Sequence, residues 1–130
     1  LCIIWKIFNQ LAQRVGIDPE QAKTILTNVS RSLLQRADPN KASELLSKLP
    51  SGLTSMFSDN EKEQFIKTQE SIDNQEIVKN IDREAGINDK TKSLQAAEEA
   101  IRLLQEKTGI EGLMDNIMGR FKKIDLNPFD

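Results

Sequence analysis

The stretch "VGIDPEQ" at residues 15–21 returns in altered form as "AGINDKT" at residues 85–91. Each copy places a Gly-Ile step between a segment of periodic apolar residues and a polar segment. Glycine readily adopts the left-handed conformation that ends a helix, and the apolar residue after it can pack back on that helix. Each stretch therefore predicts the turn of a helical hairpin.

A shift of seventy residues aligns more than the two turns. It pairs Gly16 with Gly86, Ile17 with Ile87, and the "LLQ" of 33–35 with that of 103–105. These matches predict an internal duplication of one hairpin. The alternative is a pair of ordinary helical hairpins that have arrived at the same turn independently.

Apolar residues recur at spacings of three and four on both sides of each glycine, which is typical of amphipathic helices. Helix starts are predicted where a capping residue precedes proline or a glutamine or glutamate partner: Asp18-Pro19 with Gln21, Asp38-Pro39, Ser58 with Glu61, and Asp73 with Glu76. Helix ends are predicted at Gly16, Pro50, Gly86, Gly109 and Pro128. The residues expected to face inward are Ile4, Phe8, Leu11, Val15, Ala22, Ile25, Leu26, Val29, Leu33, Leu34, Ile77, Val78, Ile81, Leu94, Ala97, Ala100, Ile101 and Leu104.

The pattern predicts an all-α fold, a small multi-helix bundle built from two αα-hairpin repeats about 70 residues apart. We expect an N-terminal helical unit at 1–57 and a polar connecting helix or linker at 58–72. A C-terminal helical unit follows at 73–123, and an extended tail at 124–130.

Composition excludes several classes of site. The 130 residues carry a net charge of -2 with both signs interspersed, so no strong field favours nucleic acid. Without histidine, Ser–His and Cys–His nucleophilic pairs cannot form, and a zinc site is not expected. Cys2 is the only cysteine, which rules out an internal disulfide and favours a reducing, cytoplasmic setting.

The remaining polar motifs do not indicate catalysis. Glu98 and Glu99 are adjacent on a predicted helix, so their side chains point about 100° apart and cannot share one site. Neither an EF-hand loop nor a glycine-rich phosphate loop occurs in the sequence. We therefore expect a protein that is not an enzyme and that needs no metal and no cofactor.

The segments "FNQLAQRVGIDPEQAKTIL" and "ASELLSKLPSGLTSMF" resemble a family of small helical bacterial domains of unknown function, DUF2267. The resemblance covers about residues 8–57 and rests on a helix, a glycine turn and an alanine-led second helix. A Leu-Pro element follows, whose positions here are Leu45, Leu49, Pro50, Leu53 and Phe57. The resemblance implies the helical fold and a unit that is often carried twice. It brings no activity.

The N-terminal "LCIIWKIF" is the most apolar window in the chain. If Ile4 and Phe8 face the core, then Ile3, Trp5 and Ile7 lie around the rest of the helix, and only Lys6 is charged. A helix that is apolar on all sides needs cover on several sides, which a small bundle does not supply. We predict that this helix binds a protein partner or a second copy of the chain; the alternatives are a membrane surface and an ordinary core helix.

The C-terminal segment offers a second candidate surface. Met114, Met118 and Phe121 form an apolar stripe, which suits either the core or an adaptable binding surface. Arg120, Lys122 and Lys123 could contact an anionic surface, or could simply complement the end of a helix.

The sequence as a whole predicts a non-enzymatic helical interaction or assembly protein that docks through its N-terminal helix. A peripheral membrane protein that uses the same helix and the C-terminal basic residues is the first alternative. A small helical enzyme of unrecognised type is the second.

Overall fold

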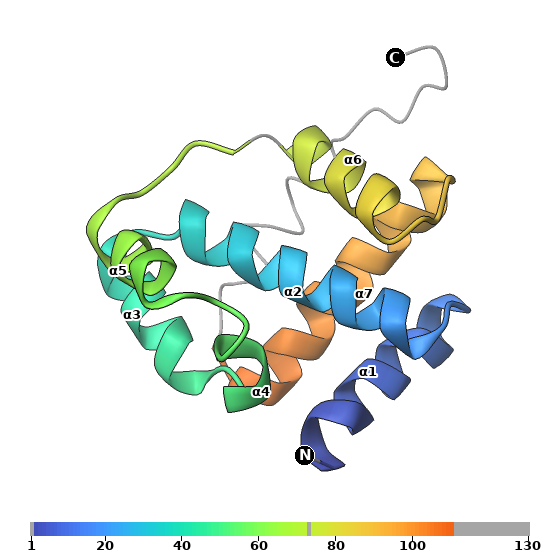
Figure 1. Ribbon diagram of the computed structural model, residues 1–130, viewed down its shortest axis with the longest axis horizontal. Helices are drawn as coiled ribbons and strands as arrows, with labels where there is room; N and C mark the ends of the chain where they lie inside the picture. Colours follow the sequence, from blue (N-terminus) through green and yellow to red (C-terminus); the bar gives the residue numbers. More distant parts are fainter. Residues whose placement is uncertain (1, 73, 111–130) are drawn as a thin grey trace.

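The computed structural model describes residues 2–72 and 74–110. These residues form seven α-helices, drawn in Figure 1: α1 (Cys2–Val15), α2 (Pro19–Arg36), α3 (Pro39–Lys48), α4 (Ser51–Thr54), α5 (Asp59–Lys67), α6 (Asn74–Glu84) and α7 (Lys90–Thr108). The prediction of an all-α bundle is confirmed. The predicted helix after Gly109 and the tail at 124–130 lie almost wholly outside the described residues.

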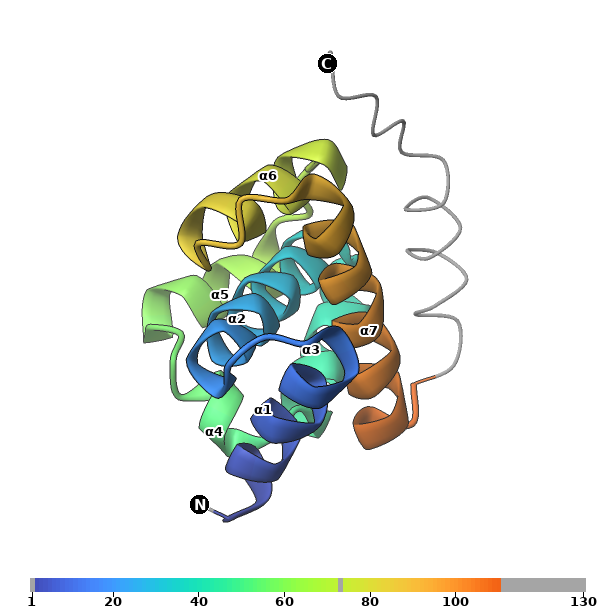
Figure 2. The same ribbon diagram turned by 90° about the vertical axis from the view of Figure 1, so that its right-hand side faces the viewer.

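Two helical hairpins, α1–α2 and α6–α7, pack against each other. α1 contacts both α2 and α7, and α6 also contacts both α2 and α7. Figures 1 and 2 show α2 running through the middle of the molecule, with α6 above it and α1 below. α2 contacts each of the other six helices, so the second helix of the chain is its central element.

A smaller group of helices, α3 to α5, packs on α2 beside the hairpins. Its side chains in the core include Phe57 and Phe65, whose rings meet edge to face with centroids 5.5 Å apart. Both rings are buried. The polar stretch at 58–72 therefore contains a helix, α5, that contributes one aromatic side chain to the core, and a non-helical segment at 68–72.

One hydrophobic cluster joins all of these helices. Its most deeply buried large side chains are Ile7, Leu11, Ile25, Leu26, Leu34, Leu45, Leu53, Ile81, Ile101, Leu103 and Leu104. They come from both of the helical units predicted at 1–57 and 73–123. Leu94, which was expected to face inward, lies half-buried at the edge of the cluster.

The two glycine turns have the predicted geometry. Gly16 and Gly86 adopt left-handed φ values of 79° and 67°. The next amide bonds back across the helix end in each case: Ile17 N–H donates to the Ala12 carbonyl at 3.0 Å, and Ile87 N–H to the Asp82 carbonyl at 3.1 Å. Both isoleucines pack against the core. These are Schellman-type closures.

The helix starts follow the capping pattern of the sequence. Capping boxes join Asp18 to Gln21 and Ser58 to Glu61, and the Asp38 carboxylate accepts a hydrogen bond from the Lys41 amide. The predicted cap at Asp73 lies outside the described residues. Local side-chain chemistry thus fixes where α2, α3 and α5 begin.

Candidate functional site

The exposed apolar residue of α1 is Trp5. Its side chain is 43% exposed, and its ring stands edge-on to Phe8 at a centroid distance of 5.6 Å. Phe8 is only 2% exposed, so the indole rests against a fixed core side chain. Trp5 is thereby held at the border between the core and the surface.

Ile7 corrects part of the predicted surface on α1. It is 1% exposed and belongs to the core, so it cannot reach a partner in this fold. The reason is that α1 packs on two helices, α2 and α7, rather than on one. At about 100° per residue, its buried positions 7, 8, 11, 12 and 15 span about 140° of the helix, and position 5 falls just outside that arc.

The other predicted contact residues are not described. The side chains of Ile3 and Ile4 lie outside the described part of α1. Six further residues belong to 111–130, which also lies outside the described residues: Met114, Met118, Phe121, Arg120, Lys122 and Lys123. Among the described side chains, the predicted partner-binding surface is therefore centred on Trp5.

Polar side chains surround Trp5 on the exposed face of α1. They are Lys6, Asn9, Gln10 and Gln13. Lys6 forms no ion pair with a described residue, whereas Arg14 at the far end of α1 contacts Glu99 and Glu106 of α7 at 3.8 and 3.3 Å. An aromatic side chain within a polar rim is the usual layout of a protein-binding surface.

A second candidate site, which sequence reasoning missed, is a groove between α2 and α6. It has a volume of about 580 Å³, and the segment at 70–72 crosses one of its ends. The lining residues are Asn28, Arg31, Ser32 and Gln35 of α2, Glu70, Ser71 and Ile72 of the connecting segment, and Glu76, Asn80 and Glu84 of α6. The sequence pattern that could have indicated this groove is the spacing of four between Glu76, Asn80 and Glu84, which places them on one side of α6.

Hydrogen bonds tie α2 to its neighbours at both ends of this α2–α6 groove. At one end the Gln21 side-chain amide donates to the Ala85 carbonyl at 2.9 Å. At the other end Arg36 donates to the Asn74 side chain, and the Glu70 amide donates to the Gln35 carbonyl at 2.7 Å. The groove is thus a fixed feature of the fold rather than a gap between independent helices.

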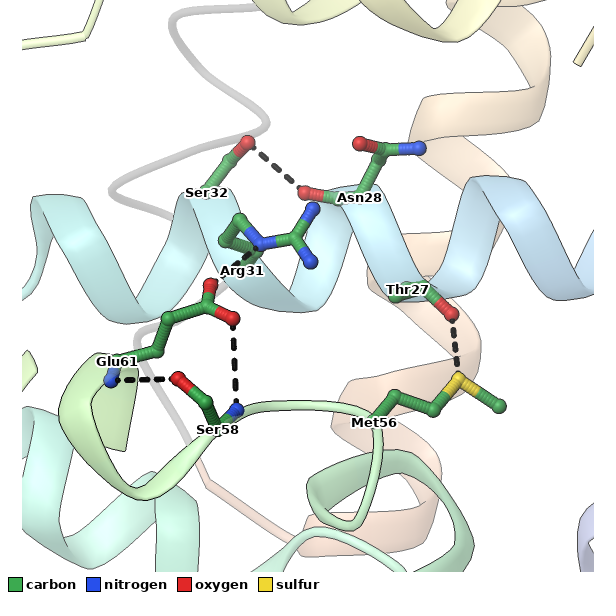
Figure 3. A network of polar contacts seen from close by, with 7 residues as sticks. All are labelled: Thr27, Asn28, Arg31, Ser32, Met56, Ser58 and Glu61. Atoms are coloured by element: carbon green, nitrogen blue, oxygen red, sulfur yellow. Dashed lines mark hydrogen bonds and ion pairs between the residues drawn. The ribbon is translucent and has the colours of Figure 1, made fainter. Parts of the chain in front are cut away.

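Arg31 lines the groove and also reaches the α3–α5 group, where Figure 3 shows it beside Glu61. Its Nε donates to Glu61 at 3.0 Å, and its guanidinium lies 5.4 Å from the centre of the Phe57 ring. Glu61 also completes the capping box with Ser58. The terminal nitrogens of Arg31 donate to no other described residue, so they remain available to a ligand.

Residues 2–72 and 74–110 contain no group of three or more acidic or cysteine side chains placed to hold a metal ion. No helix among them is long and apolar enough to cross a membrane.

The chain matches the model of a family described as "Uncharacterized conserved protein (DUF2267)" over residues 6–121. It belongs to that family. The resemblance seen at residues 8–57 is therefore confirmed, and the DUF2267 match extends through α6 and α7. Neither a curated protein nor a solved structure matches the chain.

Proposed function

We propose that this DUF2267 protein is a non-enzymatic interaction protein that docks onto a protein partner through the Trp5 surface of α1. The observation that carries the proposal is the indole itself. Trp5 and Ile66, at 43% and 42%, are the large apolar side chains among the described residues that remain exposed. Trp5 is the larger, and tryptophan is enriched among the residues that dominate binding energies at interfaces.

The contact with Phe8 makes Trp5 a suitable anchor. An edge-on aromatic pair at 5.6 Å restricts the indole before binding, because Phe8 is fixed in the core. A side chain that is already restricted loses less conformational entropy when it enters a pocket. Trp5 can therefore bind with less opposing entropy than a freely rotating side chain.

The residues around Trp5 define the kind of partner. Asn9, Gln10 and Gln13 give an uncharged polar rim, and Lys6 adds one positive charge. The complementary surface is an apolar pocket for the indole with an acidic side chain beside it. The absence of histidine from the sequence supports a binding role over catalysis, and the proposal places the protein in the cytoplasm.

The test compares Trp5→Ala with Ile66→Ala in the full chain. The two residues are equally exposed and lie on different helices, so Ile66→Ala is a matched control. Once a partner has been isolated with the wild-type chain, Trp5→Ala should weaken its binding by about 30-fold, because anchor residues contribute roughly 2 kcal/mol or more. Ile66→Ala should leave the affinity within about twofold of the wild type.

Circular dichroism of both variants provides the folding control. Helix content should be unchanged, since Trp5 lies outside the buried arc of α1. Equal binding by the two variants would reject the Trp5 surface as the docking site. Co-sedimentation of the wild-type chain with anionic liposomes, lost in Trp5→Ala, would replace the protein partner with a membrane surface.

A further inference from the structure

The α2–α6 groove presents the side chains that suit a peptide backbone. Three of its lining residues carry a carboxamide group: Asn28, Gln35 and Asn80. A carboxamide has an acceptor oxygen and two donor hydrogens, so it can bond both the N–H and the C=O groups of a peptide ligand. The Asn28 amide nitrogen donates to the Thr24 carbonyl and the Asn80 oxygen accepts from Arg83, which fixes the orientation of both side chains. Gln35 forms no side-chain hydrogen bond with a described residue.

The charges at the groove favour a cationic ligand. Glu70, Glu76 and Glu84 form no ion pair with a described residue, whereas the charge of Arg31 is already offset by Glu61. The side chains that line the groove thus include three carboxylates and one guanidinium, so the net charge of the lining is negative. Glu76, Asn80 and Glu84 follow one another at spacings of four on α6, so they form one inclined row on the helix surface.

The spacing of these carboxylates fits an extended chain. Eight residues of helix span about 12 Å, and four residues of extended peptide span about 13 Å. Side chains two and four residues apart on an extended peptide point to the same side. Basic residues at such positions can therefore meet Glu76 and Glu84 together, while the carboxamides contact the backbone between them.

We propose that the α2–α6 groove binds an extended polypeptide segment of a partner, one that carries Lys or Arg residues on one face. Its volume of about 580 Å³ lies within the range of about 300–1,000 Å³ that is common for ligand sites. α6 lies at the top of the molecule and α1 at the bottom in both Figures 1 and 2, so this site is separate from the Trp5 surface. Binding at the groove and binding at the Trp5 surface can therefore be tested independently.

The experiment uses nuclear magnetic resonance on the nitrogen-labelled full chain. The probe is a capped octapeptide of alternating Lys and Gln, which places all its lysines on one face when extended. At low salt, we expect the side-chain amide resonances of Asn28, Gln35 and Asn80 to shift. The indole N–H of Trp5, which is the chain's only tryptophan, is an internal control and should not move.

Two double variants separate the groove from general surface charge. Glu76→Gln with Glu84→Gln should weaken binding of the octapeptide about 5- to 10-fold, because each removes one ion pair with the ligand. Glu44→Gln with Glu63→Gln makes the same change in net charge on α3 and α5, where both residues pair with lysines. This control should change the affinity by less than about twofold.

A third variant tests recognition of the peptide backbone. Gln35→Ala with Asn80→Ala should weaken binding about threefold without changing its salt dependence, since no charge is removed. Trp5→Ala should bind the octapeptide as tightly as the wild type does. Circular dichroism of each variant checks that the fold is kept.

Several results would overturn the assignment. Shifts spread over both faces, equal losses in the two charge variants, or equal binding of an alternating Glu and Gln octapeptide would each show that the groove has no specific role. An absence of shifts would do the same. If Arg120→Gln, Lys122→Gln and Lys123→Gln together tighten binding, the chain's own basic residues occupy the groove instead of a partner.

Discussion

The two glycine turns close their first helices alike but start their second helices differently. Gly16 and Gly86 share the left-handed conformation, and the following isoleucine amide bonds back across the helix end in both. Beyond the isoleucine the two turns diverge. The residues that reverse the chain direction are therefore distinct from those that begin the next helix.

The first turn restarts its helix with local residues. Asp18 caps α2, Pro19 occupies the first helical position, and Gln21 completes the capping box. The Gln21 side chain also donates to the Ala85 carbonyl, which lies next to the second turn. One residue therefore serves both the start of α2 and the contact between the hairpins.

The second turn restarts its helix by reaching back to α6. Asn88 takes a left-handed φ of 57°, and Asp89 then caps α7. The Asp82 carboxylate of α6 accepts hydrogen bonds from the Asp89 amide and from the Ser93 hydroxyl, both at 2.8 Å. The same Gly-Ile reversal is thus compatible with two different ways of beginning the next helix. The common origin of the hairpins stays a prediction.

The largest expected effects come from the core that the two hairpins share. Ile25 of α2 and Ile81 of α6 are both fully buried. Ile25→Ala and Ile81→Ala should each lower the free energy of unfolding by about 2–5 kcal/mol, through lost burial and a residual cavity. Denaturant unfolding followed by circular dichroism should show one transition for each variant. Two separate transitions would mean that the hairpins fold independently.

The next largest effects should come from the side chains that begin α2 and α7. Asp82→Ala removes two hydrogen bonds to a charged acceptor and leaves the buried Ser93 hydroxyl without its partner, so it should cost about 2 kcal/mol. Gln21→Ala should cost about 1 kcal/mol, because its two side-chain hydrogen bonds, with the Asp18 amide and the Ala85 carbonyl, join uncharged groups. Thermal unfolding of the two variants gives the order. The reverse order would show that the local restart is the stronger of the two.

Substitution of the glycine in either turn should lower the free energy of unfolding by the same amount. Gly16→Ala and Gly86→Ala place a side chain at a left-handed φ, which should cost about 1–2 kcal/mol at each turn. A Cβ built at either glycine meets no surrounding atom within 4 Å, so the cost comes from the local backbone conformation and not from a clash with a neighbouring element. Urea midpoints for the two variants should agree. A clear difference would show that one turn is held by contacts beyond the shared closure.

The smallest effect is confined to the second turn. Asn88→Ala should cost about 0.5–1 kcal/mol, since asparagine tolerates the left-handed region better than alanine does. The matched position in the first turn is Asp18, whose φ of -85° suits any residue, and its loss is felt through the cap instead. Asn88→Gly is the control, and it should restore the wild-type stability within a few tenths of a kcal/mol. An equal loss in both Asn88 variants would assign the effect to the asparagine side chain.

Local signals predicted the elements of this fold well. Asp18, Ser58 and Gly109 mark helix ends through hydrogen bonds within a few residues, so their effect can be read from nearby sequence. The burial of Ile7 could not be predicted from such local signals. The sequence gives the apolar residues of α1, but the width of its buried arc depends on how many helices pack around it.

The groove shows the same limit for function. Glu76 was predicted only as the partner of a helix cap, and Asn80, Glu84 and Arg31 belong to none of the motifs identified in the sequence. They line a common groove only because α2 and α6 pack side by side and the segment at 70–72 crosses one end. Residues that line the groove together are up to 56 positions apart in the chain, from Asn28 to Glu84, and no local pattern links them.

The sequence alone determined that this chain is helical, that it turns at Gly16 and Gly86, and which residues begin several of its helices. Each of those features depends on backbone conformation and hydrogen bonds within about five residues. The tertiary structure decided that α2 is central, that Ile7 is buried while Trp5 is not, and that a polar groove lies along α6. Burial and concavity arise when distant helices meet, and their free energies depend on that packing rather than on any one segment.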